Sequence, residues 1–98
     1  MPGRKLKVVL TRKLPDSIET RMRELFDTEL NLDDRALSKD ELKEAVARAN
    51  VLVPTITDRI DAEVLAAAGE DLKLIANFGA GVDHIDVAAA VERGLVVS

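Results

Sequence analysis

The stretch LKLIANFGAGVDHIDVAAAVERGLVV, Leu72–Val97, contains one complete strand–loop–helix–strand unit and decides the fold class. Its two ends, Leu72–Ala76 and Leu95–Val97, are short apolar runs typical of buried strands. Between them, the pattern predicts a helix that begins after Asp86 as its N-cap and ends at Gly94. Two strands joined by one helix predict a right-handed crossover between parallel strands.

The preceding residues repeat this alternation of strand and helix. Further strands are predicted at Leu6–Leu10, at Glu29–Leu32 as a weak edge strand, and at Val51–Val53. A first helix is expected after Pro15, which suits an initial helical turn. Ser38 and Glu41 form a capping box for a second helix. Asp61 is the expected N-cap of a third helix, with Gly69 at its C′ position.

Five strands alternating with four helices predict an α/β fold with a parallel sheet covered on both faces. We expect the flavodoxin-like strand order 2-1-3-4-5, with flanking helices. In this order the first helix shares its face with a helix that follows the fifth strand, and the sequence stops before such a helix. The final helix is therefore expected to be missing, which leaves aliphatic sheet surface bare. Such a surface indicates a fragment, a self-association, or both.

The composition excludes several classes of function. The net charge of −4 and the absence of tryptophan and tyrosine argue against nucleic-acid binding. The absence of cysteine excludes disulfides and thiol catalysis. No apolar run approaches the length of a signal peptide core or a membrane span. We therefore expect a cytoplasmic chain with no membrane or nucleic-acid partner.

The glycine-rich loop after the fourth strand is the main candidate site. Gly79 and Gly81 match the first half of a dinucleotide fingerprint, but His84 occupies the position of its third glycine. Two glycines let the chain turn sharply and leave backbone N–H groups free to hold a small anion. A glycine-rich turn without any ligand is the alternative. Arg12 and Lys13, after the first strand, could attract anions, although solvated surface charge is the commoner explanation.

The segment LIANFGAGVDHIDVAAA, Leu74–Ala90, continued by ERGLVV, Glu92–Val97, resembles the D-2-hydroxyacid dehydrogenases, most closely their glyoxylate and hydroxypyruvate reductase branch. The resemblance implies that this segment belongs to the N-terminal substrate-binding domain, which has a flavodoxin-like fold. Residues 1–98 would then be a partial substrate-binding (catalytic) domain, with the nucleotide-binding domain absent. The specific resemblance is concentrated between Leu74 and Ser98.

By position, the resemblance implies that the backbone N–H groups of Ala80 and Gly81, in the loop that Gly79 opens, bind the substrate carboxylate. Val53 and Thr55, at the end of the third strand, would form another wall of the pocket. The Thr55 hydroxyl would donate a hydrogen bond there, or it would simply cap the strand end.

The resemblance implies no catalytic residue in this chain. The family's proton-donating histidine, its glutamate and its carbonyl-polarising arginine all lie further along the sequence. His84 beside Asp83 suggests a catalytic relay, but a carboxylate aimed at a 2-oxo acid would repel it. A structural role or a pocket contact is therefore preferred for His84, and Asp83 is expected to tie the loop to backbone donors.

Two functional readings follow. In the first, the parent protein is an NAD(P)-dependent oxidoreductase acting on CH–OH groups, which reduces a small 2-oxo acid such as glyoxylate or hydroxypyruvate. This chain alone would be inactive and bind neither NAD nor NADP nor a metal, because the cofactor belongs to the nucleotide-binding domain of the same protein. In the second, the chain is a stand-alone α/β module for dimerisation or protein binding. A homodimer is expected in either case.

Overall fold

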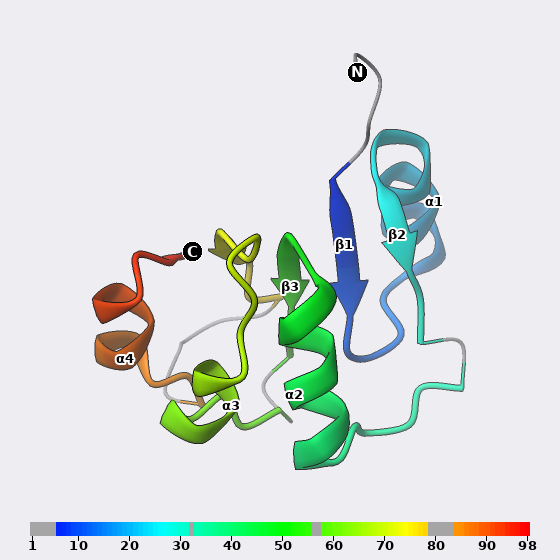
Figure 1. Ribbon diagram of the computed structural model, residues 1–98. Coiled ribbons are helices and arrows are strands. Elements are labelled where there is room, and N and C mark those ends of the chain that lie inside the picture. The colour runs from blue at the N-terminus through cyan, green and yellow to red at the C-terminus, as the bar shows by residue number, and fades with distance from the viewer. Residues whose placement is uncertain (1–5, 32, 56–57, 79–83) are drawn as a thin grey trace.

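The computed structural model describes residues 6–31, 33–55, 58–78 and 84–98 (Figure 1). Strands and helices alternate along the whole chain, as the sequence predicts. In chain order the elements are β1 (Lys7–Leu10), α1 (Asp16–Leu25), β2 (Asp27–Glu29), α2 (Lys39–Arg48), β3 (Val51–Val53), α3 (Ala62–Ala66), β4 (Leu74–Ile75), α4 (Val87–Glu92) and β5 (Val96–Val97).

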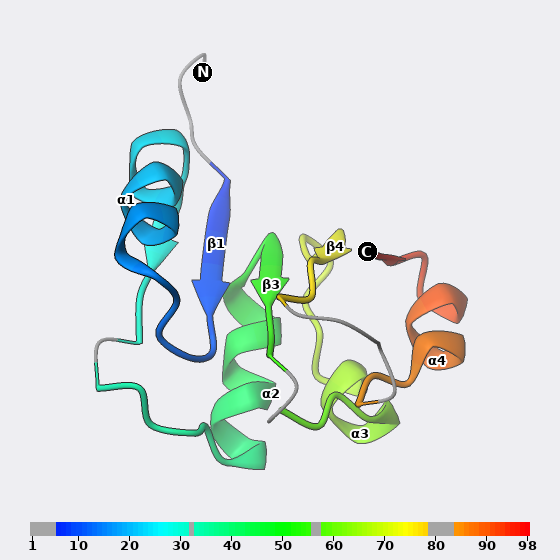
Figure 2. The same ribbon diagram turned by 180° about the vertical axis from the view of Figure 1, so that it is seen from behind.

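The strands form one parallel sheet in the order β2-β1-β3-β4-β5, which confirms the flavodoxin-like prediction. The first strand is therefore internal, with Val9 opposite Glu29 on one side and Leu52 on the other. Helix α1 covers one face of the sheet, and α2, α3 and α4 cover the other (Figures 1 and 2). The chain thus folds as one α/β unit with a helix layer on each face.

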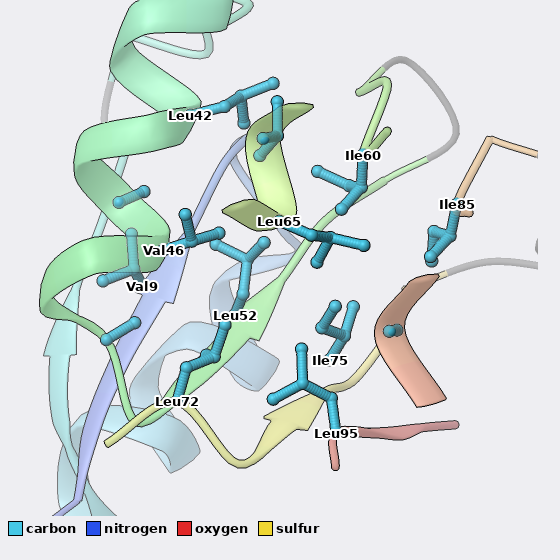
Figure 3. Packing of buried hydrophobic residues seen from close by; sticks show 14 residues of the cluster. Val9, Leu42, Val46, Leu52, Ile60, Leu65, Leu72, Ile75, Ile85 and Leu95 are labelled. Atoms are coloured by element: carbon cyan, nitrogen blue, oxygen red, sulfur yellow. The ribbon is translucent and has the colours of Figure 1, made fainter. Parts of the chain in front are cut away.

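Strand residues alternate between two apolar clusters, one on each face of the sheet. Val9, Leu52 and Ile75 point toward α2, α3 and α4 and belong to the larger cluster (Figure 3). Val8 and Val53 belong to a smaller cluster on the α1 face. This alternation follows from the two-residue period of a strand, and it explains why nearly every side chain in the inner strands is apolar.

The helix ends follow the predicted capping residues. Ser38 and Glu41 form a complete capping box at the start of α2. Asp61 accepts a hydrogen bond from the Val64 N–H, and Asp86 accepts one from the Ala89 N–H. At the end of α4, Gly94 has a φ of 79°, where glycine is favoured because it lacks a Cβ.

That end of α4 is a Schellman motif. The Gly94 N–H donates to the Val91 carbonyl at 2.9 Å, and the Leu95 N–H donates to the Ala90 carbonyl at 3.0 Å. Leu95 is buried in the larger cluster directly after the turn. The motif therefore delivers the chain into β5 and satisfies two terminal carbonyls of the helix.

Several predicted bounds are wrong. Strand β4 is limited to Leu74–Ile75 instead of Leu72–Ala76, and β1 and β5 each begin one residue later than predicted. Strand β2 spans Asp27–Glu29 instead of Glu29–Leu32, because the register with β1 pairs Lys7 with Asp27. Helix α3 ends at Ala66, so Gly69 lies beyond the C′ position. A Cβ at Gly69 would lie 2.6 Å from the Ala47 carbonyl oxygen, and the residue therefore serves a close approach to α2.

The α1 face is covered only over part of the sheet. Val96 on β5 is 60% exposed, and its partner Leu74 on β4 is half-buried. Ala76, which packs at the margin of the smaller cluster, is also half-buried. Aliphatic surface thus remains open over β4 and β5 within the described residues. No helix in this described part of the chain is long and apolar enough to cross a membrane.

Candidate functional site at the carboxyl ends of the strands

The strand order places a topological switch point between β1 and β3. The chain leaves β1 toward β2 on one side and returns to β3 on the other. In open α/β sheets, ligands bind in the crevice outside the carboxyl ends of the strands at such a point. Thr11 directly follows β1, and Pro54 and Thr55 directly follow β3. The predicted wall of the pocket therefore lies at the switch point.

The two predicted wall residues differ in their surroundings. Val53 is 3% exposed, its side chain packs in the smaller apolar cluster, and its carbonyl accepts a hydrogen bond from the Thr11 N–H at 3.3 Å. Thr55 is half-buried, and its N–H donates to Asp58 Oδ2 at 2.9 Å. The Thr55 hydroxyl lies 3.4 Å from the same oxygen. This contact favours the alternative in which the Thr55 hydroxyl caps the end of the third strand.

The predicted carboxylate-binding residues Gly79, Ala80 and Gly81, together with Asp83, lie outside the described residues. The residues on either side of this segment are described, and they contact each other: His84 Nε2 lies 2.7 Å from Asn77 Oδ1. With its proton on Nε2, His84 donates this hydrogen bond. The side chain of His84 therefore joins the two ends of the glycine-rich loop, a contact suited to a structural role.

Both ends of this loop are also bonded to the segment after β3. The Phe78 N–H donates to the Pro54 carbonyl at 2.9 Å. Ile60 forms a parallel bridge with Ile85, in which its N–H donates to the His84 carbonyl at 2.9 Å. The glycine-rich loop is thus attached before and after its centre to the neighbouring loop. A small hollow of about 180 Å³, lined in part by Arg59, Ile60 and His84, lies beside this bridge.

A buried polar pair that the sequence reasoning missed joins the end of β1 to the segment after β3. Thr11 is 0% exposed and Asp58 is 3% exposed. The Thr11 hydroxyl donates to Asp58 Oδ2, which also accepts from the Thr55 N–H. One local signal pointed to Asp58: it follows Thr55 by three residues, the spacing at which an aspartate can bond the backbone of a turn.

The basic residues after β1 are engaged by acidic neighbours. Arg12 Nε lies 2.9 Å from Asp34 Oδ1, and the Lys13 N–H donates to the same oxygen at 3.0 Å. The hydrogen bond from the Arg12 guanidinium lowers the pKa of the Asp34 carboxyl most, and the hydrogen bond from the Lys13 N–H lowers it further. The Lys13 ammonium contacts both Asp16 and Glu19. Anion attraction by these cations is therefore reduced by the carboxylates beside them.

The start of α1 is not suited to bind a nicotinamide dinucleotide, the cofactor that the resemblance assigns to the nucleotide-binding domain. A dinucleotide pyrophosphate needs a glycine turn with free N–H groups at the start of the first helix. Here the turn lacks glycine, and the Leu14 N–H donates to the buried carboxylate of Glu19 at 3.0 Å. Asp16 adds a second carboxylate at the same place. The Leu14 N–H is therefore not available to bind a pyrophosphate at this turn.

Comparison with known proteins relates the chain to one enzyme family. The catalytic domain of the D-isomer specific 2-hydroxyacid dehydrogenases matches residues 8–98. A glyoxylate reductase of Thermococcus onnurineus is 38% identical over 94 residues, covering 96% of this chain and 28% of the relative. A glycerate dehydrogenase of Hyphomicrobium methylovorum is 32% identical over 93 residues, covering 95% of this chain and 29% of the relative.

The fold has a close match among solved structures. A crystal structure from a Polaromonas species, described as a possible NAD-binding D-isomer specific 2-hydroxyacid dehydrogenase, has a TM-score of 0.89 and 39% identity. It is matched over 95% of this chain and 29% of its own length. The chain thus spans under a third of the length of the relatives it matches. On the match over residues 8–98, the chain belongs to the D-isomer specific 2-hydroxyacid dehydrogenase family.

Proposed function

We propose that residues 1–98 are part of the substrate-binding domain of an enzyme that reduces a small 2-oxo acid, such as glyoxylate or hydroxypyruvate, with NAD or NADP. The observation that carries this proposal is the attachment of the glycine-rich loop to the segment after β3, which borders the switch point. Phe78 bonds to Pro54 at its start, and His84 bonds to Ile60 at its end. The names of the two relatives, a glyoxylate reductase and a glycerate dehydrogenase, favour the same class of substrate.

In this proposal the backbone N–H groups of Ala80 and Gly81 hold the substrate carboxylate, in the turn that Gly79 begins. Val53 and Thr55 contribute the facing wall. The role of this site is orientation: a carboxylate fixed in one place presents the adjacent carbonyl in one direction. The anchored ends of the loop support this role, because binding groups must be held in place before the ligand arrives.

The same proposal assigns no catalytic residue to this chain. The nucleotide-binding domain of the same protein would hold the cofactor and the groups that act on the carbonyl, and the 98 residues alone would be inactive. The unsuitable turn before α1, where the Leu14 N–H is taken by Glu19, supports a cofactor site elsewhere. A cytoplasmic location is part of the proposal, and the cysteine-free sequence favours it.

Titration of the ¹⁵N-labelled chain with glyoxylate tests the carboxylate site. We expect saturable shifts of the backbone amides from Gly79 to Val82 and of Thr55, at millimolar concentration, because only part of the pocket is present. The Gly94 amide, in the turn after α4, is the internal reference. Sodium chloride at equal ionic strength controls for screening. If glyoxylate leaves Gly79–Val82 unmoved while other surfaces respond, the anchoring role is wrong.

A second candidate function is self-association as a stand-alone module, which the open aliphatic surface over β4 and β5 favours. Val96 is 60% exposed there. We expect a homodimer, with a mass by light scattering near twice the 10.7 kDa of one chain. Val96→Lys should return the chain to a monomer, because a charge would be buried in the contact. Leu25→Lys, at a 53% exposed residue of α1, is the matched control.

A monomer at high concentration would contradict the dimer, and an unchanged dimer in the Val96→Lys variant would contradict this location for the contact. These results are independent of the glyoxylate titration. A chain that dimerises without binding glyoxylate would favour the stand-alone module over the enzyme part.

A further inference from the structure

We propose that Asp58 is a positioning residue that holds the loops at the carboxyl edge of the sheet in a single arrangement. The inference deepens the proposed function, because two of these loops form the proposed carboxylate site. Asp58 lies between β3 and α3, within the segment that follows Thr55. Its hydrogen bonds reach both sides of the topological switch point.

One carboxylate oxygen carries this connection. Asp58 Oδ2 accepts hydrogen bonds from the Thr11 hydroxyl, at the end of β1, and from the Thr55 N–H at 2.9 Å. The Asp58 N–H donates back to the Thr55 carbonyl at 3.0 Å. Asp58 thus closes its own turn and bonds that turn to β1. Because one oxygen accepts both hydrogen bonds, Asp58 holds the end of β1 and the turn at Thr55 in a fixed position relative to each other.

The remaining loops at this edge attach to the same network. The Thr11 carbonyl accepts from Asn31 Nδ2 at 2.8 Å, which joins the loop after β2. Two residues beyond Asp58, the Ile60 carbonyl accepts from the Asp86 N–H at 2.8 Å, which joins the segment after β4. Asp58 itself thus bonds the loops after β1 and β3, and these two loops in turn bond those after β2 and β4.

The burial of Asp58 indicates a role other than stability. Asp58 is 3% exposed, and its Oδ1 is buried without a hydrogen-bond partner among the described residues. A buried carboxylate with one oxygen unsatisfied is costly, and an apolar side chain of similar volume would often be as stable or more so. An arrangement of loops that requires this acceptor at this point accounts for the cost.

Two substitutions of Asp58 test the role. Asp58→Ala removes the acceptor, and we expect amide hydrogen exchange of Thr55, Ile60 and Phe78 to accelerate by about tenfold or more, as the loss of about 1.4 kcal/mol of local stability would produce. Asp58→Asn keeps a carbonyl oxygen that can accept at the Oδ2 position, and exchange should stay within about threefold of the unsubstituted chain. Asp71→Ala, at an exposed aspartate, is the matched control.

The glyoxylate titration supplies a functional readout. Asp58→Ala is expected to weaken glyoxylate binding about tenfold, because each factor of ten corresponds to about 1.4 kcal/mol of lost preorganisation. Asp58→Asn should retain the affinity. Equal affinity in Asp58→Ala and the unsubstituted chain would overturn the positioning role for the site. If the unsubstituted chain does not bind glyoxylate, the proposed function fails, and the exchange measurement alone decides the role of Asp58.

A third variant covers the case in which Asp58→Ala does not fold. Thr11→Val is nearly isosteric and removes the hydroxyl that donates to Asp58 and lies 3.5 Å from the Val53 carbonyl oxygen. Faster exchange of the Thr55 and Ile60 amides in Thr11→Val, with Leu52 in β3 unchanged, would support the inference. Unchanged exchange in Thr11→Val or in a folded Asp58→Ala would overturn it. Loosening in Asp58→Asn equal to that in Asp58→Ala would also overturn the proposed hydrogen-bond connection.

Discussion

Leu52→Ala is expected to lower the free energy of unfolding by about 2–5 kcal/mol, the usual range for truncating a buried leucine. Leu52 is 0% exposed and lies at the centre of β3, the middle strand of the sheet. Figure 3 shows its side chain near Val46 of α2 and Leu65 of α3, in the larger apolar cluster. Because the residues around Leu52 belong to the sheet and to two helices, they cannot all move into the space left by the shorter side chain, so a cavity should remain.

Urea denaturation measures this loss as a lower transition midpoint at an unchanged slope. Leu25→Ala is the matched control, because it makes the same truncation at a leucine of α1 that is 53% exposed. Its effect should stay within about 0.5 kcal/mol, as for most surface substitutions. A loss below about 1 kcal/mol in Leu52→Ala would mean that the core refills the space, contrary to close packing of the interior.

Gly69→Ala is expected to cost about 1–3 kcal/mol, the usual range for inserting an atom where no space exists. The added Cβ would lie 2.6 Å from the carbonyl oxygen of Ala47 in α2. That neighbour is backbone inside a helix, so it cannot rotate away as a side chain would. The Gly69 N–H also donates to the Val46 carbonyl at 3.2 Å, a bond that a shift of the chain would lengthen.

Gly94→Asn separates this clash from the general cost of replacing glycine. Gly94 has a φ of 79° and open space around its Cβ position. Asparagine adopts such backbone angles more readily than most residues, so the loss should stay below about 1 kcal/mol. Thermal denaturation of both variants measures the difference. Equal stability of Gly69→Ala and the unsubstituted chain would show that α2 and the segment after α3 separate without cost.

Most of the architecture could be predicted because its signals are local. Apolar runs identify the strands, and Ser38, Asp61 and Asp86 mark helix starts through bonds that span only three residues. The right-handed crossover then restricts the topology, so the order β2-β1-β3-β4-β5 followed from few alternatives. These rules operate within a segment or between successive segments.

The errors and omissions concern contacts between distant segments. The first and last residues of β2 depend on its register with β1, and no residue near Asp27 indicates that register in the sequence. A glycine is required at position 69 because the chain passes close to the Ala47 carbonyl oxygen in α2, and the sequence near Gly69 does not show this contact. The hydrogen bond between Thr11 and Asp58 joins residues 47 positions apart, so neither residue indicates the other in the sequence. Of the hydrogen bonds that Asp58 accepts, only the one from the Thr55 N–H could be expected from the local sequence of the turn.

The internal position of β1 has a consequence for the order in which the chain acquires its structure. Lys7–Leu10 is synthesised before both of its partners, which are Asp27–Glu29 on one side and Val51–Val53 on the other. The three strands β2, β1 and β3 therefore cannot all pair until Val51–Val53 has been synthesised. Until then the apolar residues of β1 have no second neighbour, and pairings so distant in sequence are slow to form. A newly made chain is thus expected to be most vulnerable to aggregation before Val53 emerges.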